Sequence, residues 1–276
     1  MISLPINQII CGDCLEVMKT FPDKSIDLIV TDPPYFLPAV HYNTRKYFSR
    51  NFADLGILEH FFKDVFKEFS RIIKQESYIY IFCNGQSYPL FYFHLYPFCK
   101  SVRPLIWDKL TSINGYSWRH QHELIIFAEM PKSKPIPSGD GDVLKCRAVK
   151  VDERLHPAQK PLDLIKRLIQ KSSKENDIIL DPFAGSGTTC IAAQELNRRW
   201  LGIDISRKYC NIASARFGGA EVVELEGVLL PSKPSLTEKK EQLVGGTCGY
   251  AGACSYRNED GNCLFKRLCK DKRRCV

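Results

Sequence analysis

The stretch Asp181-Pro-Phe-Ala-Gly-Ser-Gly-Thr-Thr189 decides the fold. An apolar run, Ile178 to Leu180, precedes it, and an alanine-containing apolar run, Cys190 to Leu196, follows it. This order predicts a strand, a tight turn and a helix. Elsewhere short apolar runs alternate with segments whose apolar residues recur at helical spacing, as in Ile57 to Lys74. The alternation predicts an α/β fold with a mostly parallel sheet and helices on both faces.

The glycines of this turn indicate a ligand. Gly185 and Gly187 allow backbone angles that other residues rarely adopt, and they let a ligand approach the backbone closely. Thr188 stands where the helix begins, with backbone amides free to bind an anionic group. Asp204 ends the next apolar run, Trp200 to Ile203, and an acid there suits the hydroxyls of a ribose. The pattern indicates a nucleoside-containing cofactor, although a glycine-rich turn serves packing alone in many α/β proteins.

A second motif, Asp32-Pro-Pro-Tyr35, follows the predicted strand Ser25 to Val30. Ligand sites in open parallel sheets lie at the carboxyl ends of strands. The two prolines extend the backbone and remove two amide donors, so the Pro33 carbonyl is free to accept a hydrogen bond. Asp32 is a second acceptor, and Tyr35 offers a flat ring. The set suits an exocyclic amino group on a planar heterocycle, whereas the structural alternative is a proline-rich turn after a strand.

The two motifs together resemble those of S-adenosylmethionine-dependent DNA amino-methyltransferases of the permuted, β-type order. In that family the Asp-Pro-Pro-Tyr motif precedes the cofactor motif. The matching segments are Gly12-Asp13 with Asp27 to Tyr35, His122-Glu123, His156 to Pro161, and Asp181 to Thr189 with Leu201 to Asp204. The resemblance covers residues 6 to about 217. It implies a Rossmann-like methyltransferase fold with a seven-stranded sheet and a circularly permuted motif order.

The resemblance also implies roles for individual residues. Asp204 is expected to hold the ribose hydroxyls, Asp13 and Cys14 to contact the adenine, and Lys160 to contact the methionine end of the cofactor. The methionine side of the cofactor is assigned to the turn and the start of its helix. These turn residues are Asp181, Phe183, Ala184, Gly185, Gly187 and Thr188. The catalytic set is Asp32, Pro33, Pro34 and Tyr35.

The expected reaction is methyl transfer to the exocyclic amino group of a base flipped out of double-stranded DNA. The family resemblance favours adenine N6, because Asp-Pro-Pro-Tyr is commoner there than in cytosine N4 enzymes. Cytosine N4 remains the alternative. An RNA base or a protein amide as substrate is a further alternative, although those relatives more often carry Asn-Pro-Pro-Tyr. A catalytically silent DNA-binding regulator would be expected to have a damaged motif, and both motifs are intact.

The charge balance fits a polyanionic partner. The chain has 39 Lys and Arg against 31 Asp and Glu, a net charge of +8. Two basic loops, 36–55 and 131–153, interrupt the predicted catalytic domain 1–217, and both are too short to form a compact recognition domain. No signal segment or membrane span is predicted, so we expect a cytoplasmic location. The sequence leaves open a homodimer and a partner restriction endonuclease.

The carboxyl-terminal part needs a separate interpretation. Residues 218–246 are predicted to be a linker, and 247–276 a small, basic, cysteine-rich module. Its cysteines are Cys248, Cys254, Cys263, Cys269 and Cys275. So short a module cannot build its own core, and four of the five thiolates on zinc, or on an iron–sulfur cluster, would stabilise it. The alternative is a disordered basic tail.

Overall fold

The computed structural model describes residues 4–35, 55–111, 118–136, 139–156, 158–219 and 222–224. In these residues the strands form a nine-stranded sheet with the order β6-β4-β5-β3-β2-β7-β8-β1-β9. The strands are β1 (Gln8–Cys11), β2 (Ile26–Thr31), β3 (Ile73–Cys83), β4 (Ser101–Asp108), β5 (His122–Glu129), β6 (Val143–Lys145), β7 (Ile178–Asp181), β8 (Arg199–Asp204) and β9 (Val222–Val223). The helices are α1 (Cys14–Lys19), α2 (Leu55–Ile72), α3 (Tyr88–Leu95), α4 (Leu162–Ser172), α5 (Thr188–Glu195) and α6 (Arg207–Arg216).

The expected count of seven strands is corrected to nine among the described residues. The additional strands, β6 and β9, lie at the two edges of the sheet and have three and two residues. Strands this short show too little apolar alternation to be recognised in a sequence. β6 lies inside the predicted loop 131–153, and β9 lies inside the predicted linker 218–246, where it pairs with β1.

The sheet is mostly parallel, as predicted. Strand β2 runs parallel to both β3 and β7, and β1 runs parallel to β8. β5 is antiparallel to its neighbours β3 and β4. The first residues of β5 therefore lie at the same edge of the sheet as the carboxyl ends of β2 and β7. This edge collects the ends of segments that are far apart in the chain.

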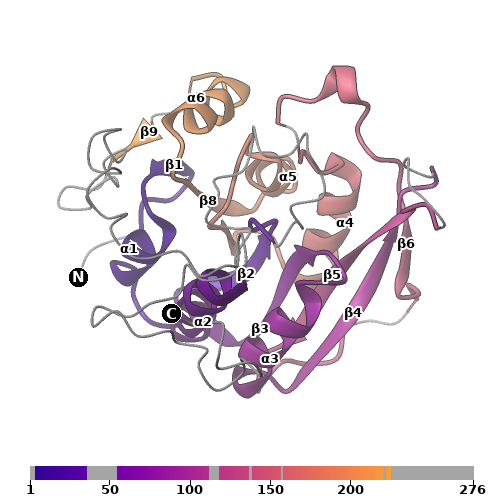
Figure 1. The fold of residues 1–276 in the computed structure, drawn as a ribbon. Coiled ribbons are helices and arrows are strands. Elements are labelled where there is room, and N and C mark those ends of the chain that lie inside the picture. The colour runs from indigo at the N-terminus through magenta and orange to yellow at the C-terminus, as the bar shows by residue number, and fades with distance from the viewer. Residues whose placement is uncertain are drawn as a thin grey trace, which may run out of the picture. The chain divides into compact units, whose positions relative to one another are not determined.

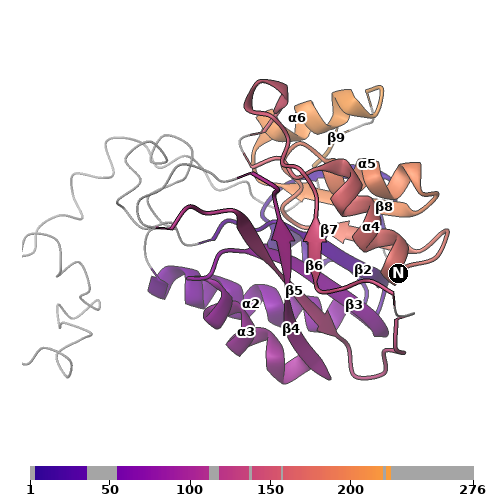
Figure 2. The same ribbon diagram turned by 90° about the vertical axis from the view of Figure 1, so that its right-hand side faces the viewer.

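Helices cover both faces of the sheet, as Figures 1 and 2 show. On one face α1, α2 and α3 pack with residues such as Val17, Phe62, Phe66 and Phe91 in one buried apolar cluster. On the other face α4, α5 and α6 contribute residues such as Leu168 to a second cluster. Successive strand residues point to opposite faces of the sheet, and helices cover both faces. The central residues of β2, Leu28 to Val30, and of β7, Ile178 to Leu180, are therefore apolar without interruption.

The amino-terminal strand β1 pairs with β8, which comes late in the chain, as the permuted motif order requires. β1 lies beside β8, with Gln8 opposite Leu201 and Cys11 opposite Asp204. The Gly12 amide donates a hydrogen bond to the carbonyl of Asp204 at 3.0 Å. Asp13 then caps α1 by accepting a hydrogen bond from the Leu15 amide at 2.8 Å. Strand β1, at the start of the chain, and strand β8, which follows the glycine turn, are thus neighbours in the sheet.

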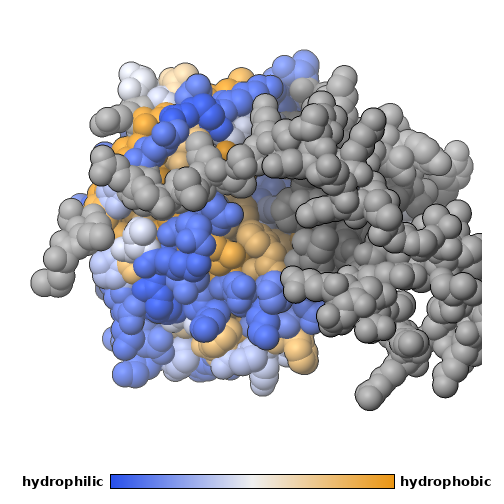
Figure 3. All heavy atoms as spheres, turned by 60° about the vertical axis from the view of Figure 1, so that its left-hand side comes forward, coloured by the Kyte–Doolittle hydropathy of each residue, from blue (hydrophilic) through white to orange (hydrophobic). Residues whose placement is uncertain are grey.

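Most predicted elements are present with shifted ends. Helix α3 ends at Leu95 and continues as a 3₁₀ turn, Tyr96–Phe98, because Pro97 has no amide hydrogen to donate to a helical bond. No helix among the described residues has the length and apolar character that crossing a bilayer requires. On the face shown in Figure 3, hydrophilic residues form much of the described surface, with hydrophobic ones between them.

Candidate active site

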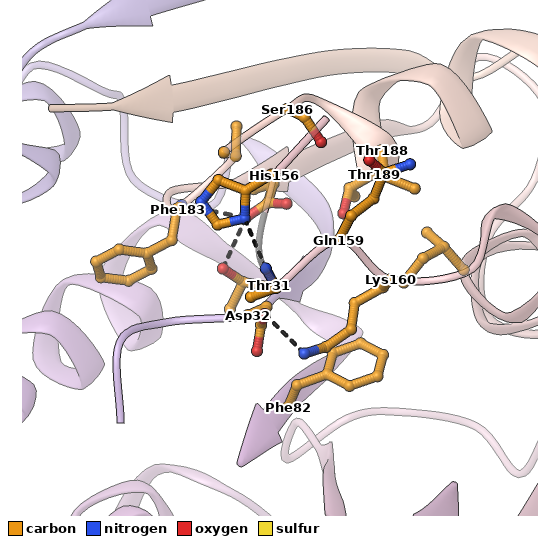
Figure 4. Close-up of a pocket in the computed structure, with 15 residues that line it drawn as sticks. Thr31, Asp32, Phe82, His156, Gln159, Lys160, Phe183, Ser186, Thr188 and Thr189 are labelled. Carbon is orange, nitrogen blue, oxygen red and sulfur yellow. Dashed lines mark hydrogen bonds and ion pairs between the residues drawn. The ribbon is translucent and has the colours of Figure 1, made fainter. Parts of the chain in front are cut away.

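The two sequence motifs meet in one pocket (Figure 4). Asp32 follows β2, and Asp181 ends the neighbouring strand β7, so the sheet places both carboxylates at the same edge. A third wall comes from the segment before α4. The residues that line the pocket are Thr31, Asp32, Phe82, His156, Ala158, Gln159, Lys160, Ile165, Asp181, Phe183, Ala184, Gly185, Ser186, Thr188 and Thr189.

Asp181 is buried and joins the two motifs. Its Oδ1 atom accepts hydrogen bonds from the Thr31 hydroxyl at 2.7 Å and from the Phe183 amide at 3.1 Å. Burial raises the pKa of Asp181 to about 6, although these hydrogen bonds oppose the rise. A buried carboxylate that is costly to ionise is stabilised when a cation binds beside it. Asp181 therefore suits a positively charged ligand.

The turn after β7 depends on its glycines. Gly185 and Gly187 have φ angles of +52° and +78°, in the left-handed region that favours glycine. A Cβ at Gly187 would lie 3.0 Å from the Cβ of Ala213 on α6. Arg216 of α6 fixes the turn from outside by donating a hydrogen bond to the Ser186 carbonyl at 2.6 Å. Helix α6 and the turn thus form one packed unit.

Asp204 closes the turn on its other side. Its Oδ2 atom accepts a hydrogen bond from the Gly185 amide at 2.9 Å, and its Oδ1 atom accepts one from the Ser206 amide at 2.8 Å. Burial raises the pKa of Asp204, although these two hydrogen bonds oppose the rise. Each carboxylate oxygen has a second lone pair. Asp204 can therefore accept further hydrogen bonds from ligand hydroxyls.

Asp13 and Cys14 lie near Asp204, because β1 and β8 end side by side. Cys14 is buried, and burial together with the adjacent Asp13 carboxylate raises the pKa of its thiol above the usual value. The thiol is thus neutral and inert, which suits packing against an apolar ring face. The positions predicted to surround an adenosine are brought together.

His156 lies over the glycine turn. A Cβ at Gly185 would be 3.6 Å from its ring, and the Tyr209 ring meets it edge-on at a centroid distance of 4.4 Å. Burial lowers the pKa of His156 to about 4, and the positive charge of Lys160 adds to this effect. His156 is therefore neutral at physiological pH, and its ring adds no charge to a pocket that carries two carboxylates.

A row of alternating charges lies beside Asp32. Asp32 Oδ2 is 2.8 Å from the ammonium nitrogen of Lys160, and the same nitrogen is 3.1 Å from Glu123 Oε2. Glu123 Oε1 in turn lies 2.5 Å from the ammonium nitrogen of Lys109. The Lys160 side chain is 7% exposed, so solvent screens this row far less than a surface ion pair.

The row determines the ionisation of its members. Burial raises the pKa of Asp32 to about 6, while Lys160 opposes the rise. Burial alone would also raise the pKa of Glu123, but Lys160 and Lys109 outweigh it and leave that pKa below its usual value. For Lys160 burial lowers the pKa, and Asp32 and Glu123 outweigh it and raise the pKa. At neutral pH Asp32, Glu123 and Lys160 are therefore all charged.

One carboxylate oxygen of Asp32 is available to a ligand. Its Oδ1 atom is buried and has no hydrogen-bond partner in the described part of the chain. An unsatisfied buried acceptor costs about 1–3 kcal/mol, and a bound donor removes that cost. Pro33 and Pro34 follow Asp32, and the Tyr35 ring packs against the apolar cluster beneath α2. The arrangement favours a ligand that donates hydrogen bonds at Asp32.

The comparisons with known proteins agree with this arrangement. A family model described as DNA methylase, whose name joins N6 and N4 methyltransferases, matches residues 26–215. The chain belongs to the DNA methylase family. The type II methyltransferase M.HpaI of Haemophilus parainfluenzae is 30% identical, with 76% of this chain and 73% of that protein covered. M.HinfI of Haemophilus influenzae, also a type II methyltransferase, is 28% identical over 94% of this chain and 82% of its own length.

A solved structure supports the fold of this DNA methylase. The M1.HpyAVI–SAM complex superposes with a TM-score of 0.55 and 24% identity, covering 76% of this chain and 98% of that chain. The Rossmann-like methyltransferase fold predicted from the sequence is thereby confirmed. The family name covers both N6 and N4 enzymes, so the choice of base is a separate question.

Two residues beside the methylase pocket, joined to it through Lys160, received no role from sequence reasoning. Glu123 belonged only to the matching segment His122-Glu123, and Lys109 was assigned no role. Both residues lie at strand ends on the same edge of the sheet: Glu123 is near the start of β5, and Lys109 directly follows β4. Lys160, predicted to contact the cofactor, has its ammonium group on Asp32 and Glu123, and its cofactor contact stays a prediction.

The predicted metal site is not among the described residues. Within the described ranges of this methylase, no three His, Cys, Asp or Glu side chains are grouped so that they could hold a metal ion. Cys248, Cys254, Cys263, Cys269 and Cys275 all lie outside these ranges, as does most of the loop 36–55. The zinc or iron–sulfur prediction for the tail therefore stays a prediction.

Proposed function

We propose that this DNA methylase transfers a methyl group from S-adenosylmethionine to the N6 amino group of adenine in double-stranded DNA. The observation that carries the proposal is the meeting of Asp32 with the glycine turn in one pocket. On the base side that pocket has a buried acceptor, Asp32 Oδ1, to which no described residue donates a hydrogen bond, and on the cofactor side it has a second buried carboxylate, Asp181. The M1.HpyAVI structure was solved with SAM, which supports the same cofactor here.

The residues of the cofactor side fit S-adenosylmethionine. Asp204 has the acceptor capacity for ribose hydroxyls, and Asp13 with Cys14 would border the adenine. Asp181 favours the cationic methionine part, and Phe183, Ala184, Gly185 and Thr188 line the pocket around it, with Gly187 at the N-cap of α5. When bound, the cofactor supplies an electrophilic methyl group. We retain Lys160 as a predicted neighbour of the methionine end and examine a second role for it below.

The residues of the base side orient the nucleophile. Asp32 Oδ1 accepts one hydrogen of the target amino group, and the Pro33 carbonyl accepts the other. This draws the nitrogen lone pair out of conjugation with the ring. Tyr35 stacks on the flipped base, a contact worth roughly 1–3 kcal/mol. Asp32 acts mainly as an orienting acceptor, because a weakly basic amino group gains most from correct positioning. The surplus proton leaves after methyl transfer.

Cytosine N4 is the second candidate, since the family covers both amino groups. Asp32 and Pro33 would hold either amino group in the same way, and the Asp-Pro-Pro-Tyr form of the motif supports adenine through family resemblance. We further infer that the basic loops 36–55 and 131–153 contact phosphates, that the cysteine-rich tail is held by a metal, and that the protein acts in the cytoplasm. A homodimer and a cognate restriction endonuclease are compatible with type II relatives.

One experiment tests the function and the base together. The gene is expressed in a host that lacks its own DNA methyltransferases, and the genomic DNA is sequenced with detection of modified bases. We expect N6-methyladenine within one short sequence context. N4-methylcytosine in a fixed context would support the second candidate, and unmodified DNA from cells that contain folded protein would refute methyl transfer to DNA.

A further inference from the structure

The Asp32–Lys160 pair presents an acceptor and a donor side by side within the pocket. Asp32 Oδ1 has no hydrogen-bond partner among the residues that the structure describes, and the Lys160 ammonium nitrogen lies 2.8 Å from the other oxygen of the same carboxylate. An ammonium group has three N–H donors, and Asp32 and Glu123 engage at most two of them. One N–H of Lys160 is therefore left for a ligand. Both side chains line the same pocket (Figure 4).

The bases that carry an amino group present the complementary pattern. On the edge of adenine the N6 amino group donates and the adjacent ring nitrogen N1 accepts. Cytosine shows the same order with its N4 amino group and N3. Guanine and thymine show the reverse order, with a carbonyl acceptor beside a ring N–H donor. Enzymes that flip a base read it by hydrogen bonds to this edge. An acceptor beside a donor selects amino bases and rejects oxo bases.

We propose that Lys160 donates a hydrogen bond to the ring nitrogen beside the target amino group, so that Asp32 and Lys160 together read the edge of the flipped base. The inference rests on the proposed function and adds a specificity-determining residue to it. It also explains how one pocket design serves both adenine and cytosine, since both offer the same donor–acceptor order.

Glu123 and Lys109 hold Lys160 in place for this contact. Glu123 lies 3.1 Å from the Lys160 ammonium nitrogen, and Lys109 fixes Glu123 at 2.5 Å. The faces of Phe82 and Trp107 are 5.1 Å and 6.0 Å from the same nitrogen, and they keep water from one side of it. A lysine held by two carboxylates and two rings loses little further freedom when a base binds. The row thus preorganises the donor.

The test replaces the ring nitrogen and the lysine separately and together. A synthetic duplex with the mapped target contains either adenine or 1-deazaadenine, which keeps the amino group but has C–H in place of N1. For a cytosine target the analogue is 3-deazacytosine. The specificity constant kcat/KM is measured for the wild type and for Lys160→Met. The intrinsic effect of the analogue on the amino group affects both proteins equally, so the comparison isolates the contact.

We expect the wild type to prefer the natural base over the analogue by about 10- to 100-fold more than Lys160→Met does, as for a hydrogen bond from a charged donor. Lys160→Arg keeps a charged donor and should retain most of this preference. Lys166→Met is the matched control, because Lys166 on α4 pairs with Glu195 and does not line the pocket. It should discriminate as the wild type does.

Two measurements keep the test decisive if Lys160→Met turns over too slowly or folds poorly. Duplex dissociation constants with S-adenosylhomocysteine give the same ratio without turnover. The double variant Lys160→Met, Glu123→Gln removes one positive and one negative charge together and leaves the net charge of the row unchanged. Equal discrimination by the wild type and both Lys160→Met proteins would overturn the proposal. A wild type that methylates no DNA base would instead refute the proposed function.

Discussion

Replacing Asp32 should affect methyl transfer without affecting the binding of the cofactor. We expect Asp32→Ala to abolish methyl transfer, because the target amino group loses the acceptor that orients it, while S-adenosylmethionine still binds to the turn after β7. Methylation is measured with radiolabelled cofactor and genomic DNA from a methylation-deficient host, and cofactor binding by calorimetry. Asp32→Asn, which keeps one acceptor oxygen, should retain part of the activity. Full methylation by Asp32→Ala would contradict the assignment.

The buried carboxylate of Asp181 is expected to lower the free energy of unfolding when it is ionised. Its pKa is about 6 in the folded protein and 3.8 in the unfolded reference, so ionisation costs stability above pH 6 and costs none below pH 3.8. The difference corresponds to about 3 kcal/mol at most. Asp181→Asn keeps the size and an acceptor oxygen. We expect the variant to have the larger free energy of unfolding at pH 8, with the gain disappearing toward pH 4, in urea titrations.

Asp140 provides the control for this prediction. Arg167 and Lys171 lower the pKa of the Asp140 carboxyl to about 2, which is the opposite direction. Asp140→Asn should therefore bring no gain in stability at pH 8. A gain for Asp181→Asn that stays constant from pH 4 to pH 8 would show that the carboxyl charge is not its cause.

Among the elements, the close packing of the start of α5 against α6 leads us to expect that Gly187 tolerates no side chain without a cost in stability. Alanine there would require a left-handed backbone and would place its Cβ 3.0 Å from Ala213 and 3.3 Å from Phe217. Gly218 has a similar φ of +73°, with no atom within 4 Å of its Cβ position. We expect Gly218→Ala to cost about 1 kcal/mol of stability from backbone strain. Gly187→Ala should cost about 1–3 kcal/mol more from overpacking, measured by urea unfolding. Equal costs would contradict this view of the packing.

Elements were predictable where a local pattern specifies them. The strand, turn and helix around Asp181 followed from apolar runs and glycines that are adjacent in the sequence. The row from Asp32 to Lys109 did not, because Asp32 and Lys160 are distant in the chain and only the sheet order brings them together. The short edge strands β6 and β9 were also missed, since their pairing depends on neighbours and not on their own composition.

For the molecule as a whole, the cysteine-rich tail carries the prediction that goes beyond the catalytic unit. We expect natively purified full-length protein to contain zinc, or iron in a cluster, in a stoichiometric amount by mass spectrometric metal analysis. The double variant Cys263→Ser, Cys269→Ser should lower that amount, because it leaves three of the five tail cysteines and four thiolates are needed to complete the site. Cys99→Ser is the control, since Cys99 is a free thiol in the catalytic unit. Protein free of zinc and iron would refute the metal.

The pairing of β1 with β8 has a consequence for how the protein is made. The Asn7 side chain accepts a hydrogen bond from the Trp200 amide, a contact that spans 193 positions. On the ribosome β1 is synthesised first, yet its partner strand emerges only after β2 to β7. Contacts of such long range form slowly. The amino-terminal segment therefore waits unpaired through most of translation, and a chain that terminates before β8 can complete neither the sheet nor the cofactor side of the pocket.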